Sequence, residues 1–293
     1  MKQTISLLII LLLFPAVLDA KEIVYIAGLQ STKASYEKFI SDKGGDPLKI
    51  HDYSSKYASR PVIALLIIVQ ALNAGGMDAQ FEFIPYPNHA RSLSELKKGK
   101  AHILDTDIWE QHFDDSVYKT APLIRSGEFE KGIYTYAESG LLQSQPDLNS
   151  LLKLKPITGM AWTTDIACLR SMGFDKIETA PTYPLLFKML SRRRADFTLL
   201  EFARGAGNHY NNDDVLYPVQ GIKVVLPYSR HFMVSRKHSG GKDVYEALEK
   251  GLNILRRDGT IERALYQSGA LCRDTRDWKI IWPEQNPKTE ITE

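Results

Sequence analysis

Two carboxylates, Asp107 and Glu201, end two segments of this chain that follow the same pattern. The segments are LKKGKAHILDTD (96–107) and LSRRRADFTLLE (190–201), and matched positions lie 94 residues apart. Each segment runs from a leucine through a basic cluster and an alanine into an apolar stretch that ends on the acid. A carboxylate held in this way can bind an ammonium group, or it can transfer a proton as a general acid or base.

The pattern predicts a helix, a turn and a buried strand in front of each acid. Cations suit the negative end of a helix dipole, so the lysines of 97–100 and the arginines Arg192–Arg194 are expected to be solvated helix ends. Ligands of open α/β sheets bind outside the carboxyl ends of the strands. The repeat therefore predicts two sheet units that each offer one acid to a ligand, unless two similar units arise by chance.

The rest of the chain also alternates between strand and helix patterns. Strands are expected at 22–28, 78–87, 101–107, 131–137, 195–202, 222–226 and 231–235, with one more short strand in the tail. Helices are expected at 59–76, 89–100 and 147–154, before Gly173, before Arg192 and twice within 241–269. Residues 29–59 are predicted to be a loop with at most a short helix. This alternation favours mostly parallel sheets with helices on both faces.

Composition limits the possible functions. The chain has 293 residues, 37 basic and 35 acidic, and its net charge of +2 argues against a nucleic-acid-binding protein. The seven histidines are scattered and no phosphate loop or nucleophile motif is present, so no cofactor or metal is expected. Cys168 and Cys272 either form a disulfide or remain as two buried thiols.

The N-terminus has the layout of a signal peptide. A short basic start is followed by the apolar run ISLLIILLLFPAVL and by a small residue, Ala20, before a charged pair. We expect cleavage after Ala20 and export to the periplasm, with a retained membrane anchor as the alternative. The apolar run is short for a membrane span.

Five segments, in order, carry a resemblance to a known family. They are FEFIPYPNHARSLSELKKGKAHIL, YKTAPLIRSGEFEKGIYTY, ITGMAWTTDI, MLSRRRADFTLLE and LEKGLNILRRDGTIERAL. Over about residues 22–270 the chain resembles bacterial extracellular solute-binding proteins of the amino-acid type (family 3). The resemblance implies an α/β, two-lobed periplasmic-binding-protein-like fold of type II, joined by a two-strand hinge. Lobe 1 would hold 21–134 and 226–293, lobe 2 would hold 135–225, and the crossings would lie near Tyr134–Glu138 and Gly221–Pro227.

The resemblance also implies a function. The protein would be a monomer that captures a small polar, amino-acid-like ligand by lobe closure and delivers it to an ABC permease or a sensor. It would not be an enzyme. The alternative is a periplasmic enzyme of the dehydratase or lyase type that uses Glu201 or Asp107 as acid or base. The two-lobed layout argues against a purely structural protein.

The family pattern assigns candidate ligand-binding residues. Glu201 takes the place of the acid that binds a ligand ammonium group, and Thr163 and Thr164 match the helix start that binds a carboxylate. Asp107 and Trp109 would border the ligand from lobe 1, with Trp109 as an apolar wall. The family's carboxylate-binding arginine is missing, because TDIWEQHFDD offers Gln111 and His112 at that place. The candidate replacements are Arg91, Arg125 and Arg204. Each of these residues could instead serve only as a helix cap, a core residue or a solvated side chain.

Overall fold

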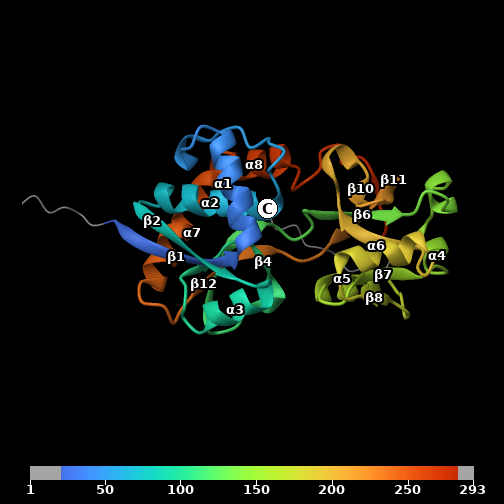
Figure 1. Ribbon diagram of the computed structural model, residues 1–293, viewed down its shortest axis with the longest axis horizontal. Coiled ribbons are helices and arrows are strands. Elements are labelled where there is room, and N and C mark those ends of the chain that lie inside the picture. The colour runs from blue at the N-terminus through green and yellow to red at the C-terminus, as the bar shows by residue number, and fades with distance from the viewer. Residues whose placement is uncertain (1–20, 283–293) are drawn as a thin grey trace, which may run out of the picture.

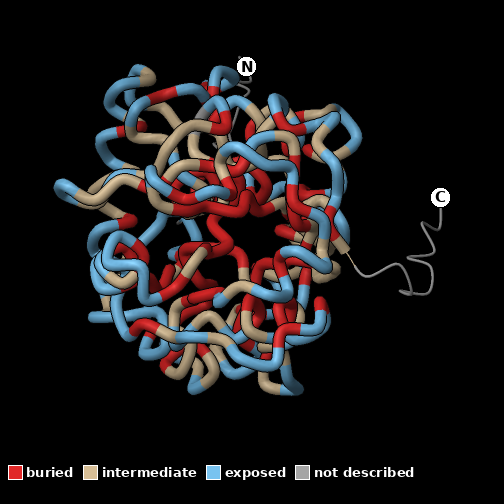
Figure 2. Tube along the Cα trace, turned by 90° about the vertical axis from the view of Figure 1, so that its right-hand side faces the viewer, coloured by how far each residue is buried: buried red, intermediate tan, exposed pale blue. Residues whose placement is uncertain are grey.

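The computed structural model describes residues 21–282, which form two lobes, each built on its own sheet (Figure 1). The predicted signal peptide and residues 283–293 lie outside the described residues. Figure 2 looks from the side of the second lobe and shows the buried segments in the interior, with exposed segments around them. Within the described range no helix is long and apolar enough to cross a bilayer.

The first sheet has the strand order β2-β1-β3-β12-β4, and β5 pairs with β12. β1 runs parallel to β2 and β3, whereas β12 is antiparallel to β3 and is supplied from late in the chain. The strands are β1 (Glu22–Leu29), β2 (Ala79–Tyr86), β3 (Ile103–Leu104), β4 (Ile108–Trp109), β5 (Val117–Ile124) and β12 (Arg230–Ser235).

The second sheet has the order β10-β11-β6-β9-β7-β8, and β13 pairs with β11. β7 is parallel to β8 and β9, and β6 is antiparallel to both β9 and β11. The strands are β6 (Phe129–Thr135), β7 (Pro156–Gly159), β8 (Glu178–Ala180), β9 (Phe197–Glu201), β10 (His209–Asn211), β11 (Asp214–Leu226) and β13 (Lys279–Ile280).

Helices cover the sheets and fill most of the connections between strands. The α-helices are α1 (Gln30–Asp42), α2 (Arg60–Ala74), α3 (His89–Lys97), α4 (Leu148–Leu151), α5 (Thr163–Ser171), α6 (Tyr183–Ser191), α7 (Gly241–Arg257) and α8 (Thr260–Ser268). The short 3₁₀ helices are η1 (Pro47–Lys49), η2 (Glu110–His112), η3 (Gly140–Gln143) and η4 (Arg204–Ala206).

Helix α2 is the central helix of the first lobe and carries the residue that matters most for the site, Arg60, at its start. Every residue from Val62 to Leu72 is buried, which explains the continuous apolar sequence of this helix. α2 packs backbone to backbone on α7: a Cβ at Gly251 would lie 1.7 Å from the carbonyl oxygen of Ala71. This close approach fixes the position of α2, and with it the position of its N-terminus at the inter-lobe boundary.

The chain passes between the sheets twice. β5 ends in the first sheet and β6 opens the second, so the first passage is residues 125–128. It precedes the expected Tyr134–Glu138 because β6 already pairs with β9 along Lys131–Tyr134. The return passage, residues 227–229, lies beside the expected Gly221–Pro227.

Several segments differ from the sequence-based expectation. The strand expected at 101–107 is reduced to β3, Ile103–Leu104, and Asp107 lies in the connection between β3 and β4. α1 occupies a region predicted to be mainly loop; its apolar periodicity is weak, and only Thr32 and Phe39 on it are buried. Packing against α2 and the first sheet therefore stabilises this helix more than its own pattern does. The tail does add the expected short strand, but β13 joins the second sheet through β11 rather than the first.

Candidate functional site

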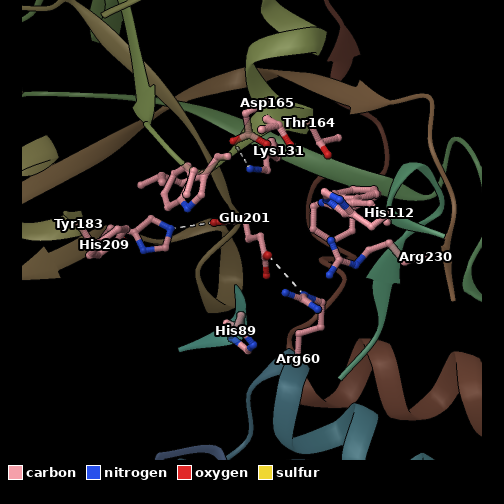
Figure 3. A pocket seen from close by; sticks show the side chains of 16 residues that line it. Arg60, His89, His112, Lys131, Thr164, Asp165, Tyr183, Glu201, His209 and Arg230 are labelled. Carbon is pink, nitrogen blue, oxygen red and sulfur yellow. Dashed lines mark hydrogen bonds and ion pairs between the residues drawn. The ribbon is translucent and has the colours of Figure 1, made fainter. Parts of the chain in front are cut away.

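A cavity of about 520 Å³ lies between the two lobes (Figure 3). Its size is within the usual range for small-molecule sites. The first lobe contributes Arg60, His89, Trp109, His112 and Arg230; the second contributes Phe129, Lys131, Ala161, Trp162, Thr163, Thr164, Asp165, Tyr183, Leu200, Glu201 and His209.

Asp107 anchors the charged network on the first-lobe side. Its side chain is 0% exposed and accepts hydrogen bonds from the guanidinium groups of Arg60, at 2.6 Å, and Arg230. Burial disfavours its charged form, but the two guanidinium groups outweigh burial and hold the pKa of Asp107 far below its usual range. Asp107 is thus a permanent anion that positions two arginines and does not itself line the cavity.

Glu201 faces the first lobe from the end of β9. Its side chain is 41% exposed, and Oε1 lies 3.4 Å from Nε of Arg60 (Figure 3). Burial raises the pKa of this carboxyl group, but Arg60, Lys131 and Arg230 outweigh burial and lower it. Glu201 is therefore ionised at neutral pH and open to the cavity.

The neighbours of Glu201 fix its backbone and enclose the cavity. Nε2 of His209 donates to the carbonyl oxygen of Glu201 at 2.7 Å. Tyr183 also lines the cavity, and burial, reinforced by the charge of Glu201, raises the pKa of its phenol to about 12. Tyr183 therefore stays neutral and can act as a hydrogen-bond donor.

A second ion pair, Lys131 with Asp165, lines the second-lobe side. Both side chains are buried, and the Lys131 ammonium group lies 5.3 Å from the ring centre of Trp162. Because each charge already has its partner, this pair offers the cavity a polar wall without a net charge.

Arg230 is held by rings as well as by Asp107. Its guanidinium carbon lies 4.2 Å from the ring centre of Trp109 and 5.5 Å from that of Phe129. Guanidinium groups stack favourably on aromatic faces. Trp109 thus positions a cation in addition to forming an apolar wall.

The positive and negative charges of the site are equal in number. Three cations (Arg60, Lys131 and Arg230) face three carboxylates (Asp107, Asp165 and Glu201). Burial lowers the pKa values of the three histidines that line the cavity, His89, His112 and His209, which keeps them neutral at pH 7. Among residues 21–282 no cluster of three or more potential metal-binding side chains occurs.

The structure brings together most of the residues that the sequence singled out. Trp109, Thr163, Thr164 and Glu201 line the cavity, and Asp107 lies directly behind it. Arg91 does not line it; its side chain is exposed and pairs with Glu95 on the same helix.

The other two candidate arginines, Arg125 and Arg204, are not found in the place of the family's carboxylate-binding arginine either. Arg125 is exposed and does not line the cavity. The side chain of Arg204 lies outside the described part of the chain. The arginines that line the cavity are instead Arg60 and Arg230.

The sequence analysis missed three charged residues of the site, Arg60, Lys131 and Arg230, because each belongs to a helix or strand whose sequence is mostly apolar. Arg60 precedes Pro61 at the start of the most hydrophobic helix, and Lys131 and Arg230 lie in the buried strands β6 and β12. A charge inside a buried element is costly unless it is paired, which is the signal that points to a site.

The possible disulfide is not formed. Cys168 and Cys272 are both free thiols and belong to separate hydrophobic clusters. Cys168 is buried in α5, and burial raises the pKa of its thiol to about 12. Cys272 is half-buried and packs against the hydrophobic cluster of the second lobe.

Comparison with known proteins identifies the fold. No family model matches the chain, and no curated protein matches its sequence. A probable amino-acid ABC transporter extracellular-binding protein from Bacillus subtilis, ytmK, matches with a TM-score of 0.55 at 13% identity, covering 84% of this chain and 97% of that chain. The periplasmic VFT2 domain of Bordetella pertussis BvgS matches with a TM-score of 0.52 at 14% identity, covering 83% and 92%.

The chain therefore has the two-lobed, type II fold of periplasmic solute-binding proteins. The resemblance indicated by the five sequence segments is confirmed at the level of the fold.

Proposed function

We propose that this protein binds a small zwitterionic ligand of the amino-acid type in the cavity between its lobes. The observation that carries the proposal is the opposed pair Arg60 and Glu201, one charge from each lobe, in a site whose other charges already balance. A ligand with one carboxylate and one ammonium group adds no net charge to such a site. A ligand with a net charge would bury that charge without compensation, which is costly.

The two charges suit the two ends of the ligand. Arginine recognises a carboxylate through paired N–H donors, and Glu201 accepts hydrogen bonds from an ammonium group. The start of α5 with Thr163 and Thr164 adds backbone and hydroxyl donors on the second-lobe side. Trp162, Tyr183 and Phe129 provide apolar surface for the rest of the ligand.

The acid–base alternative receives no support from these groups. Asp107 is shielded by two arginines, and its low pKa makes it a poor proton donor and a weak base. The lowered pKa of Glu201 suits ammonium binding better than proton donation at neutral pH. We therefore infer binding without chemistry.

Binding would draw the lobes together about the two passages between the sheets, which is a hinge-type motion. The signal-peptide pattern supports a periplasmic location, and the fold supports delivery of the ligand to a membrane permease or a sensor. The described chain is proposed to act as a monomer.

A ligand panel at pH 7 tests the proposal. The panel holds α-amino acids, the corresponding amines, monocarboxylates and dicarboxylates, each read by thermal shift and then by calorimetric titration. A ligand that binds only the folded state raises its melting temperature. We expect shifts from α-amino acids alone; shifts only from dicarboxylates, or turnover of any compound, would contradict the proposal.

A further inference from the structure

The basic clusters of the two repeated segments, 96–107 and 190–201, differ in whether their side chains form ion pairs. In the first lobe, Lys97 pairs with Asp114 at 2.6 Å and Lys98 pairs with Glu95 at 2.8 Å. In the second lobe, the side chains of Arg192, Arg193 and Arg194 are exposed and form no ion pair with any residue of the described range 21–282. Two of the three first-lobe lysines are therefore paired, with Lys100 as the exception, whereas none of the three second-lobe arginines is paired within the described range.

The backbone adds a second difference at the same position. Gly99 ends the first-lobe segment's helix with φ of +82°, the left-handed conformation that glycine adopts freely. The matching residue in the second lobe is Arg193, which adopts φ of +57° despite its side chain. A non-glycine residue in this region is strained, and strain that persists is a pointer to function.

The three arginines belong to a larger basic surface. Lys155 directly precedes β7 and Arg194 lies just before β9, and these two strands start side by side, with Pro156 paired to Phe197. We call Lys153, Lys155, Arg192, Arg193 and Arg194 the distal basic cluster; all five are exposed.

The distal basic cluster lies away from the ligand cavity. It surrounds the starts of β7 and β9, whereas Glu201 ends β9 at the cavity. Helix α4, which leads into Lys153, lies at the outer end of the second lobe (Figure 1). A partner bound here would leave the cavity entrance free.

Two acids lie close to the five cations: Asp196, whose carboxylate accepts the backbone N–H of Lys155 at 2.7 Å, and the exposed Glu178, which pairs with Ile157 across β7 and β8. The cluster keeps an excess of positive charge, and apolar side chains lie beside it. Leu152, beside Lys153, is 37% exposed, and the Arg193 guanidinium lies 5.7 Å from the ring centre of Tyr136. Clustered cations with an aliphatic side chain and an aromatic ring beside them are typical of surfaces that attach to bilayers.

We propose that the distal basic cluster is a docking surface for anionic phospholipid headgroups. Arginine forks match phosphate oxygens in pairs, which explains why arginine rather than glycine occupies position 193. Leu152 and Tyr136 would reach the headgroup boundary. This contact would hold the protein at a membrane with its ligand cavity open to solution.

Vesicle binding tests this proposal with the chain from Lys21 to Glu293, which contains every described element but lacks the apolar run of residues 5–18. Its sedimentation is measured with vesicles of phosphatidylcholine and with vesicles that also contain phosphatidylglycerol. We expect binding only to the phosphatidylglycerol vesicles, and binding that weakens as salt is added.

Two triple variants provide a matched comparison. Changing Arg192, Arg193 and Arg194 to Gln should weaken vesicle binding by at least about tenfold. Changing Lys97, Lys98 and Lys100 to Gln removes the same charge from the other lobe and should weaken it by less than about threefold. Equal losses in both variants, or equal binding to both vesicle types, would overturn the proposal.

Arg193→Gly separates docking from folding. It relieves the left-handed strain, so the melting temperature should stay the same or rise while vesicle binding falls by about fivefold. Unchanged vesicle binding in this variant would contradict the role given to Arg193. Binding of the cluster to an acidic protein, without any binding to anionic vesicles, would show that the partner is not a membrane.

Discussion

Arg60 and Glu201 face each other across the two lobes, with Nε of Arg60 3.4 Å from Oε1 of Glu201. Arg60 binds Asp107 in its own lobe more closely, at 2.6 Å. Because the inter-lobe contact is long and Glu201 is half-exposed, a ligand can replace it at small cost. The pair therefore marks the place where the two ends of a zwitterion would enter.

The first prediction concerns Asp107 as the anchor of the two arginines. Asp107→Asn removes the buried carboxylate that both arginines share, which leaves Arg230 without an ion-pair partner among the described residues and Arg60 with only its longer contact to Glu201. We expect the free energy of unfolding to fall by roughly 3 kcal/mol, measured by urea denaturation. The matched control is Asp114→Asn, whose partner Lys97 lies near the surface, with an expected cost below about 1 kcal/mol. Equal costs for the two variants would argue against a buried anchoring role.

The second prediction is a loss of stability in mild acid that depends on His102. This buried side chain accepts the N–H of Tyr25 on Nδ1 at 3.0 Å, and its Nε2 donates to the carbonyl oxygen of Ser239 at 3.1 Å. Burial, with the charge of His238, lowers the pKa of His102 to about 4. The neutral ring therefore contributes stability that is present above about pH 6.5 and is lost as the pH falls towards 4.

The measurement compares urea midpoints at pH 7 and pH 4.5 for the wild type and for His102→Asn. Asparagine keeps an acceptor for Tyr25 but does not titrate. We expect the wild type to lose roughly 2 kcal/mol more than the variant over this interval. The same pH dependence in both proteins would show that other groups control acid stability.

The third prediction concerns the packing that positions Arg60. Gly251→Ala places a methyl group 1.7 Å from the carbonyl oxygen of Ala71, so α2 and α7 must separate. We expect a loss of about 2 kcal/mol in the free energy of unfolding, together with weaker ligand binding, because the start of α2 moves. Gly140→Ala is the control, since no atom lies within 4 Å of the added methyl group. Normal stability in Gly251→Ala would mean that the two helices are not in such close contact.

The sequence predicts the fold well where its patterns are strong. The helix around Val62–Leu72 and the buried strand that ends at Glu201 occur as expected, because each is a continuous apolar run that must be buried. Asp107 does not end a strand, because β3 stops at Leu104 and Asp107 follows in the connection to β4. α1 was predicted only as a short helix at most, because it is stabilised by tertiary packing rather than by its own apolar pattern.

The site was only partly predictable for a related reason. Glu201 could be found because it ends a strand, but its partner Arg60 comes from a segment 141 residues away in sequence. No local pattern links two such residues. Their meeting depends on how the lobes are placed, which α2 packing and the two inter-lobe passages determine.

The most direct test of the ligand proposal uses an α-amino acid that binds and the carboxylic acid that lacks only its amino group. Both are titrated calorimetrically into the wild type, Glu201→Gln and the exposed second-lobe control Glu178→Gln. We predict that the wild type and the control prefer the amino acid by at least about tenfold, and that Glu201→Gln loses this preference while remaining folded. An equal preference in all three proteins would contradict the assignment of Glu201 as the ammonium-binding residue.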